Sequence, residues 1–150
     1  MTVKTADRAG WLVEGYALEE QVGHLLRRAN QRHAAIFFDG LNDHQLTPTQ
    51  FAALVKIGDE GKVSQNRLGR LTAMDPATIL GVVKRLRERD LIDAKADPTD
   101  GRRSLWHLSD PGRRLLLQVI PRAEAITRET LAPLDPAERA AFLKLLRKLA

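Results

Sequence analysis

The chain has 150 residues, of which 43% are hydrophobic and 29% are charged, and these fractions exclude disordered and fibrous proteins. It contains 24 Lys and Arg against 19 Asp and Glu, and the formal net charge of +5 indicates an anionic partner. Cysteine is absent, which excludes disulfides and thiolate metal sites.

The N-terminus lacks the apolar core of a signal peptide, and no apolar run approaches the roughly 18 residues of a membrane helix. We therefore expect a cytoplasmic protein that makes no contact with a membrane. The length favours a single domain over residues 1–150.

A long amphipathic helix is predicted first, because residues suited to a buried face recur at spacings of three and four. Its positions are Leu18, Val22, Leu25, Ala29, His33 and Ile36. A second helix is predicted from Pro48 to about Asp59, since Thr47 can cap its N-terminus and Gln50 can complete a capping box.

Two further helices are predicted close together in the middle of the chain. Ser64 can cap a short helix that ends near Leu71. Asp75, followed by Pro76, starts another helix that continues to about Arg89. Only a short turn separates the two, which is typical of a helix-turn-helix.

A β-hairpin and two helices complete the chain. The hairpin has a first strand up to Ala96, a turn over residues 97–101 and a second strand over residues 104–108, on which Trp106 faces inward. A helix begins at Ser109 and is ended or kinked by Pro121. Residues 135–138 cap the last helix. The predicted fold class is mainly α with a small β-hairpin wing.

The helix that follows Asp75 has two contrasting faces. Its apolar stripe consists of Ile79, Val82, Val83 and Leu86. The opposite face is small near the N-terminus and basic further along, which suits a helix that enters the major groove of DNA. The candidate DNA contacts are Pro76, Ala77, Thr78, Leu80, Gly81, Lys84 and Arg85, with Gln65 and Asn66 at the start of the preceding helix.

The hairpin turn adds Arg102 and Arg103, because an arginine held out on a rigid turn suits the narrow minor groove. Asp100 lies close enough in sequence to orient Arg102. Residues 62–114 hold twelve Lys and Arg against seven Asp and Glu, which leaves twelve of each sign elsewhere, so the whole basic excess lies here. A solvated basic surface is the alternative interpretation, and the hairpin next to a helix-turn-helix favours nucleic acid.

The segments LTAMDPATILGVVKRLRERDLI and DPTDGRRSLWHLSDPGRRLL resemble the MarR family of bacterial regulators, and Asp100-Gly101-Arg102 matches the Asp-x-Arg signature of its wing. The resemblance implies a winged helix-turn-helix over about 45–110, between dimerisation helices over about 12–40 and 110–150. It also implies a pocket, between the dimer interface and the winged helix, for small aromatic anions. Asp90 stands where the family usually has glycine, and it can adopt the left-handed conformation.

Candidate effector-binding and dimer residues lie mainly outside the helix-turn-helix. An aromatic carboxylate needs a cation, aromatic packing and hydrogen-bonding groups, and the effector candidates are Arg28, His33, Phe37, Gln50 and Phe51. For each residue taken singly, core or interface packing or a surface ion pair is the favoured interpretation over a ligand role. The predicted dimer-interface residues are Trp11, Tyr16, Leu18, Phe142, Leu145, Leu146 and Leu149.

These features predict a homodimeric repressor that binds a pseudo-palindromic operator and is released by a small aromatic acid, in the control of aromatic compound catabolism. A constitutive repressor and a winged-helix protein-interaction module remain the alternatives. An enzyme is not expected, because the sequence has no Gly-rich phosphate loop, no Gly-x-Ser-x-Gly elbow and no histidine cluster. No cofactor and no metal are expected.

Overall fold

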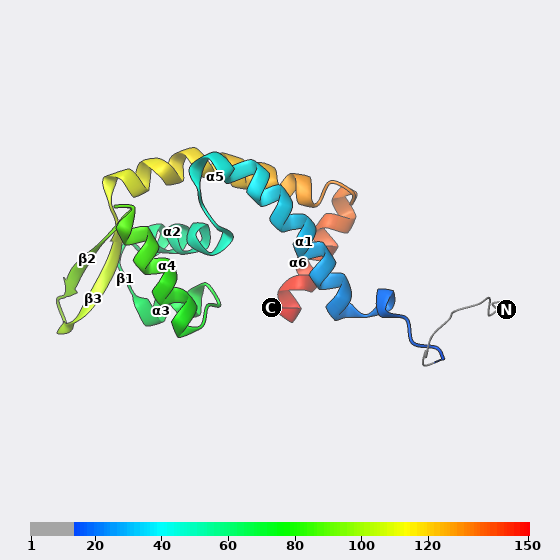
Figure 1. Ribbon diagram of the computed structural model, residues 1–150, viewed down its shortest axis with the longest axis horizontal. Helices are drawn as coiled ribbons and strands as arrows, with labels where there is room; N and C mark the ends of the chain where they lie inside the picture. The colour runs from blue at the N-terminus through cyan, green and yellow to red at the C-terminus, as the bar shows by residue number, and fades with distance from the viewer. Residues whose placement is uncertain (1–13) are drawn as a thin grey trace.

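The computed structural model describes residues 14–150, in which helices from the two ends of the chain form an arm and the middle forms a head that packs against it (Figure 1). The arm comprises the 3-10 turn η1 (Leu18–Glu20) and the helices α1 (Val22–Leu41), α5 (Asp110–Thr130) and α6 (Pro136–Leu149). The head comprises α2 (Pro48–Glu60), β1 (Val63–Ser64), α3 (Gln65–Leu71), α4 (Pro76–Glu88), β2 (Ile92–Asp97) and β3 (Asp100–Leu108). A second 3-10 turn, η2 (Asn42–His44), lies in the connection between α1 and α2.

The predicted caps fix the starts of five helices. The side chains of Thr47, Ser64, Asp75, Ser109 and Asp135 each accept a hydrogen bond from the backbone N–H three residues on. Thr47 and Asp135 belong to complete capping boxes. Local sequence therefore sets where α2 to α6 begin, as predicted.

The predicted hairpin is present, but its turn is shorter than residues 97–101, because β2 extends to Asp97 and β3 begins at Asp100, so Arg102 and Arg103 lie on β3. The hairpin belongs to a three-stranded antiparallel sheet of order β1-β3-β2. The extra strand, β1, pairs Val63 with Trp106 on β3. It is only two residues long, too short for an alternating pattern to reveal it. Trp106 is buried, as predicted, whereas Leu105 is more exposed.

The core of the head lies between α2, α3, α4 and the sheet. The side chains of Leu54, Ile57, Leu68, Leu86 and Ile92 are fully buried there. The predicted apolar stripe of α4 is confirmed, because its four members all belong to this core. Packing of that stripe fixes which face of α4 remains exposed.

The arm differs from the prediction at two points. The N-terminal helix begins at Val22 rather than Leu18, because Gln21 has extended backbone that separates η1 from α1. Helix α5 continues through Pro121 instead of ending there. Proline removes the hydrogen bond to the carbonyl four residues earlier, and that residue, Leu117, is 75% exposed, so water can satisfy its carbonyl.

The second half of α1 packs closely on the second half of α5 (Figure 1). A Cβ on Gly40 would lie 2.8 Å from the Ile126 side chain, so glycine permits this close approach. No helix within residues 14–150 is long and apolar enough to cross a membrane.

Candidate nucleic-acid interface and effector pocket

The start of α4 is stabilised by Asp75. Its carboxylate accepts hydrogen bonds from the Thr78 backbone N–H at 2.8 Å and from the Thr78 hydroxyl at 3.0 Å. These bonds, led by the backbone N–H, hold the pKa of Asp75 below its ordinary value of 3.8. The Thr78 hydroxyl, predicted to contact DNA, thus donates its proton to Asp75 and presents only its acceptor lone pairs outward.

The face of α4 opposite the core is open to solvent. Its exposed members are Pro76, Ala77, Thr78, Leu80, Lys84 and Arg85, and Gly81 is half-buried. A Cβ on Gly81 would meet nothing within 4 Å, so the glycine is not required by packing inside the chain. The predicted DNA contacts of α4 therefore share one accessible surface.

The two predicted contacts on α3 lie at its N-terminus, where Asn66 is exposed and Gln65 is half-buried. Asn66 and Pro76 contribute to a pocket of about 340 Å³ between α3 and α4, together with Gly69, Arg70, Met74 and Ile79. In the turn between these helices, Ala73 has a left-handed φ of 53°. The α3 candidates and the start of α4 thus border a single depression.

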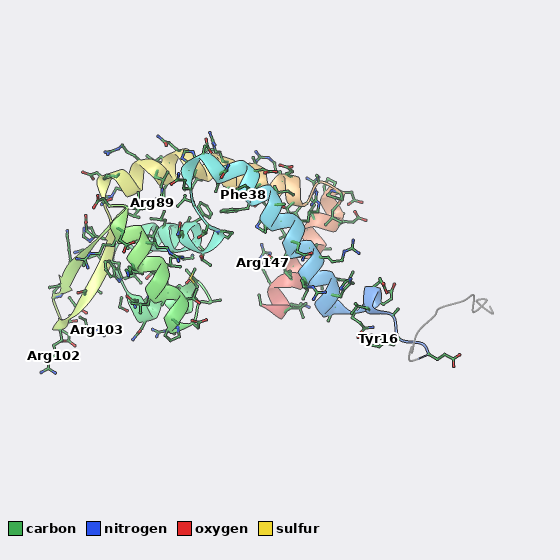
Figure 2. The ribbon with its side chains drawn as sticks, viewed as in Figure 1. Tyr16, Phe38, Arg89, Arg102, Arg103 and Arg147 are labelled. Atoms are coloured by element: carbon green, nitrogen blue, oxygen red, sulfur yellow. The ribbon has the colours of Figure 1, made fainter. Side chains whose placement is uncertain are left out.

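The wing presents Arg102 and Arg103 at its tip, away from the rest of the head (Figure 2). Asp97 accepts hydrogen bonds from the Thr99 hydroxyl and backbone N–H, which hold its pKa below the ordinary value. Asp100 accepts a hydrogen bond from the backbone N–H of Arg102 at 3.0 Å. Asp100 therefore shapes the turn, whereas the prediction assigned it to the Arg102 guanidinium.

Several arginines of the head are engaged within the chain. Arg67 pairs with Glu60 at 3.0 Å, and the Arg87 guanidinium lies 5.7 Å from the centre of the Trp106 ring. By contrast, within residues 14–150 the side chains of Lys84, Arg85, Arg102 and Arg103 have no hydrogen-bonding or ion-pair partner. These cations are free to contact an anion outside the chain.

A pocket of about 350 Å³ lies in the arm between α1, α5 and α6. It is lined by Leu26, Ala29, Asn30, His33, Thr127, Thr130, Leu131, Phe142, Leu143 and Leu146. His33 Nδ1 lies 2.9 Å from Thr130 Oγ1, which ties α1 to the end of α5. One predicted effector residue and two predicted dimer residues thus meet in this pocket.

The other predicted effector residues lie elsewhere. Phe37 is buried, with its ring centre 6.0 Å from Phe51 and 6.3 Å from His33. Gln50 is buried and its side-chain oxygen accepts a bond from the Thr47 backbone N–H, so it serves the α2 cap. Arg28 is exposed on α1. Phe37 and Phe51 therefore extend inward from His33, and Arg28 lies on the surface.

The predicted dimer residues, except Trp11, lie on the surface of the arm. Tyr16, Leu18, Phe142, Leu145 and Leu149 are exposed and Leu146 is half-buried. Trp11 lies outside the described residues. Large apolar side chains in water are costly, so this part of the arm is suited to packing against another surface.

Comparisons with known proteins identify the family to which this chain belongs. A sequence model of the MarR family matches residues 44–103. The HTH-type transcriptional repressor NicR of Pseudomonas putida is 46% identical over 134 residues, which cover 89% of this chain and 85% of NicR. The chain belongs to the MarR family of transcriptional regulators.

Two solved structures support the same assignment for this MarR chain. A probable transcriptional regulator from Pseudomonas aeruginosa is 51% identical, with a TM-score of 0.87 over 89% of this chain and all of that one. Bordetella bronchiseptica BpsR, solved in a study of how 6-hydroxynicotinic acid regulates its DNA binding, is 46% identical, with a TM-score of 0.86 over 89% of this chain and 96% of BpsR. The predicted family and fold class are confirmed.

Sequence reasoning about this MarR chain missed some residues of the arm. Asn30, Thr127 and Thr130 add polar groups to the arm pocket, and only the pairing of α1 with α5 brings them to His33. Phe38 is 62% exposed on α1, although its neighbour Phe37 is buried. Phe37 lies four residues after His33 on the predicted apolar face and Phe38 does not, so helical periodicity distinguishes the two.

Proposed function

We propose that the chain is a repressor that binds a pseudo-palindromic operator as a homodimer and leaves it when a small aromatic acid binds. The main support for DNA binding is the accessible face of α4, which ends in the unpaired cations Lys84 and Arg85. The similarity to the transcriptional repressor NicR supports repression. We further infer that the protein acts by binding rather than by catalysis, in the cytoplasm, where operators lie.

In the proposed complex, α4 enters a major groove and the wing enters the adjacent minor groove. Ala77 and Gly81 allow close approach, Leu80 contacts thymine methyl groups, and Lys84 and Arg85 reach guanine edges or phosphates. The Arg102 side chain inserts into the narrow minor groove, where the electrostatic potential is most negative. Two such heads require half-sites about 10 base pairs apart.

We infer that a second copy of the chain covers the apolar surface of the arm. In Figure 1, η1 and the start of α1 lie at the end of the molecule away from the head, and α6 lies beside α1. Exposed apolar residues of these elements include Leu18, Val22 and Leu145. A dimer formed there leaves both α4 surfaces free, which a two-fold operator requires. Phe142 and Leu146 line the arm pocket, so the partner is expected to close it.

We infer that the effector is a hydroxylated heteroaromatic acid of the kind named for BpsR. His33, Asn30 and Thr130 offer hydrogen-bonding groups beside apolar packing surface. Arg28 lies outside the pocket lining but next to Ala29, which belongs to it, and we propose that the exposed Arg28 side chain turns toward a bound carboxylate. Phe37 and Phe51 pack behind His33. Binding next to α1 and α5 favours one arrangement of the arms over the other and thereby changes the distance between the heads.

DNA binding is tested with a fluorescent duplex from the gene's own upstream region and a scrambled duplex of equal length. We expect dimeric, nanomolar, sequence-selective binding whose affinity falls steeply with added salt, because phosphate contacts release counterions. Equal and weak binding to both duplexes would reject the operator model and favour a protein-interaction module.

Effector release is tested on the same complex with benzoic, nicotinic and 6-hydroxynicotinic acids. We expect the hydroxylated heteroaromatic acid to dissociate the complex most effectively. Arg28→Gln should raise the acid concentration required by about tenfold, which corresponds to the loss of one charge-assisted contact. Arg27→Gln is the matched control, because the Arg27 guanidinium contacts His24 Nδ1 at 3.1 Å instead. If no acid releases the DNA, the chain is a constitutive repressor.

A further inference from the structure

The C-terminal end of α4 is attached to the connection that leads from the arm into the head. The Arg89 guanidinium donates hydrogen bonds to the backbone carbonyls of His44 and Gln45, both at 2.9 Å. Figure 2 shows Arg89 where the head meets the arm. These bonds join residues 44 and 45 positions apart in sequence. Arg89 therefore links the recognition helix to the α1–α2 connection.

The same connection is held to the arm from its other side. The guanidinium of Arg122 on α5 donates to both carboxylate oxygens of Asp43, at 2.8 and 2.9 Å. Gln45 has a left-handed φ of 52°, which fixes an unusual turn at the point that Arg89 contacts. Residues 43–45 are thus attached to α5 on one side and to the end of α4 on the other.

The second chain crossing between head and arm also meets the end of α4. The Ser109 hydroxyl, at the start of α5, donates to the Asp90 carbonyl at 2.6 Å, and the Ser109 N–H donates to the Leu91 carbonyl at 3.1 Å. A Cβ on Gly112 would lie 2.0 Å from the Leu91 oxygen, so α5 packs directly on this backbone. Both links between arm and head therefore converge on residues 89–91.

We propose that Arg89 is a positioning residue that fixes the recognition helix relative to the arm and thereby sets the half-site spacing that the dimer accepts. The inference rests on the proposed dimeric operator binding. In a two-fold dimer the arms fix the two connections, and Arg89 transmits their placement to α4. Ser109 and Gly112 hold the start of α5 on residues 90 and 91, whereas the Arg89 side chain joins the end of α4 to the α1–α2 connection.

The competing interpretation is that Arg89 contacts a phosphate, as a cation at the end of a recognition helix can. The structure favours positioning, because both terminal nitrogens of Arg89 are directed at carbonyls of the chain. Arg85, one turn earlier on α4, has no such partner within residues 14–150. The two arginines therefore differ in a way that binding measurements resolve.

The test measures the affinity of the full-length protein for its operator and for duplexes with one base pair inserted or removed between the half-sites. Each change rotates one half-site by roughly 35° about the DNA axis. The wild type should lose at least about tenfold in affinity on either change. In Arg89→Ala, the ratio between the affinities for the native and the altered duplex should fall below about threefold. A loosely held α4 has no fixed position, so it loses affinity for the native spacing and prefers neither spacing. Arg89→Lys, which can reach only one carbonyl, should be intermediate.

Salt dependence separates positioning from DNA contact. Arg89→Ala should keep the wild-type slope of log affinity against log salt, whereas Arg102→Ala should lower it by about one unit per contact and keep the spacing preference. Arg128→Ala, which removes a positive charge from the arm, should change neither. If Arg89→Ala has a lower salt slope and keeps the full spacing preference, Arg89 contacts a phosphate and the proposal is overturned. If Arg89→Ala behaves like the wild type in both measurements, the proposal is also overturned.

Arg122→Ala and the wild-type protein provide two further tests of the proposal. Arg122→Ala should flatten the spacing preference in the same direction although α5 lies away from the DNA surface, and it replaces Arg89→Ala if that variant fails to fold. A wild-type protein without selective operator binding would reject the proposed function itself. Selective wild-type binding with full spacing preference in both variants would reject the positioning role alone.

Discussion

Gly81 connects helix stability to DNA binding at the scale of a single residue. A Cβ at this position would meet nothing in the chain, and glycine within a helix is less stable than alanine by roughly 1 kcal/mol. Gly81→Ala is therefore expected to raise the free energy of unfolding by about 0.5–1 kcal/mol, measured by urea denaturation. The same variant should bind the operator more weakly, because the added methyl group meets the DNA. Higher stability with unchanged affinity would show that DNA does not approach this position.

Asp75 predicts a pH dependence whose sign follows from its cap. Its folded-state pKa lies below the ordinary value of 3.8, so its stabilising contribution is present above that pH and is lost as the pH falls through the folded-state pKa. Asp75→Ala should thus lower the free energy of unfolding at pH 7, and the difference from the wild type should shrink below pH 3.8. Asp75→Asn retains the acceptor oxygen and should lose less at neutral pH. A difference independent of pH would contradict the assignment.

Residues whose roles depend on near neighbours were predictable from sequence, and those that depend on distant ones were not. Thr47, Ser64 and Asp75 cap helices within three residues of themselves, so the pattern identified them. Arg89 bonds to carbonyls more than 40 positions away, which no local pattern encodes. The left-handed conformation predicted for Asp90 is present, with a φ of 55°.

At the scale of elements, the head and the arm pack against each other at the start of α5 and just after the end of α4. The first turn of α5 rests on the Leu91 carbonyl, and a Cβ on Gly112 would lie 2.0 Å from that oxygen. Gly112→Ala should therefore destabilise the protein by roughly 1–3 kcal/mol, because backbone must move to admit the methyl group. Gly101→Ala is the control, since a Cβ there meets nothing within 4 Å. Equal unfolding midpoints for the two variants would contradict the close packing.

The helix-turn-helix was predictable as a set of elements because caps, stripes and turn residues occur within short segments. Pro121 shows the limit of such rules. Its local effect predicts the end of a helix, but the neighbouring turns of α5 pack on α1 and the freed carbonyl of Leu117 can bond to water. Tertiary packing, which the local pattern does not contain, decided the length of α5.

At the scale of the whole molecule, the arm was predictable as helices but its internal pairing was not. The arm pocket brings together α1, where His33 meets Thr130 of α5 across 97 positions, and α6, which adds Phe142, Leu143 and Leu146. The family resemblance supplied the expectation of a dimer, since the apolar residues of α6 would equally fit a buried core. The exposure of those residues in the single chain is what gives the expectation its physical basis.

If α6 forms the dimer interface, a charge introduced on α6 should prevent dimerisation without preventing folding. Leu145 is 57% exposed in the single chain and would be buried by a second copy. Leu145→Glu should therefore give a folded monomer in sedimentation experiments, because a buried unpaired carboxylate opposes association. Its operator affinity should fall by at least about a hundredfold, since each head then binds one half-site alone. Leu117→Glu, on an exposed face of α5 that does not line the arm pocket, should remain dimeric and bind normally. A dimeric Leu145→Glu protein with full affinity would place the interface elsewhere on the molecule.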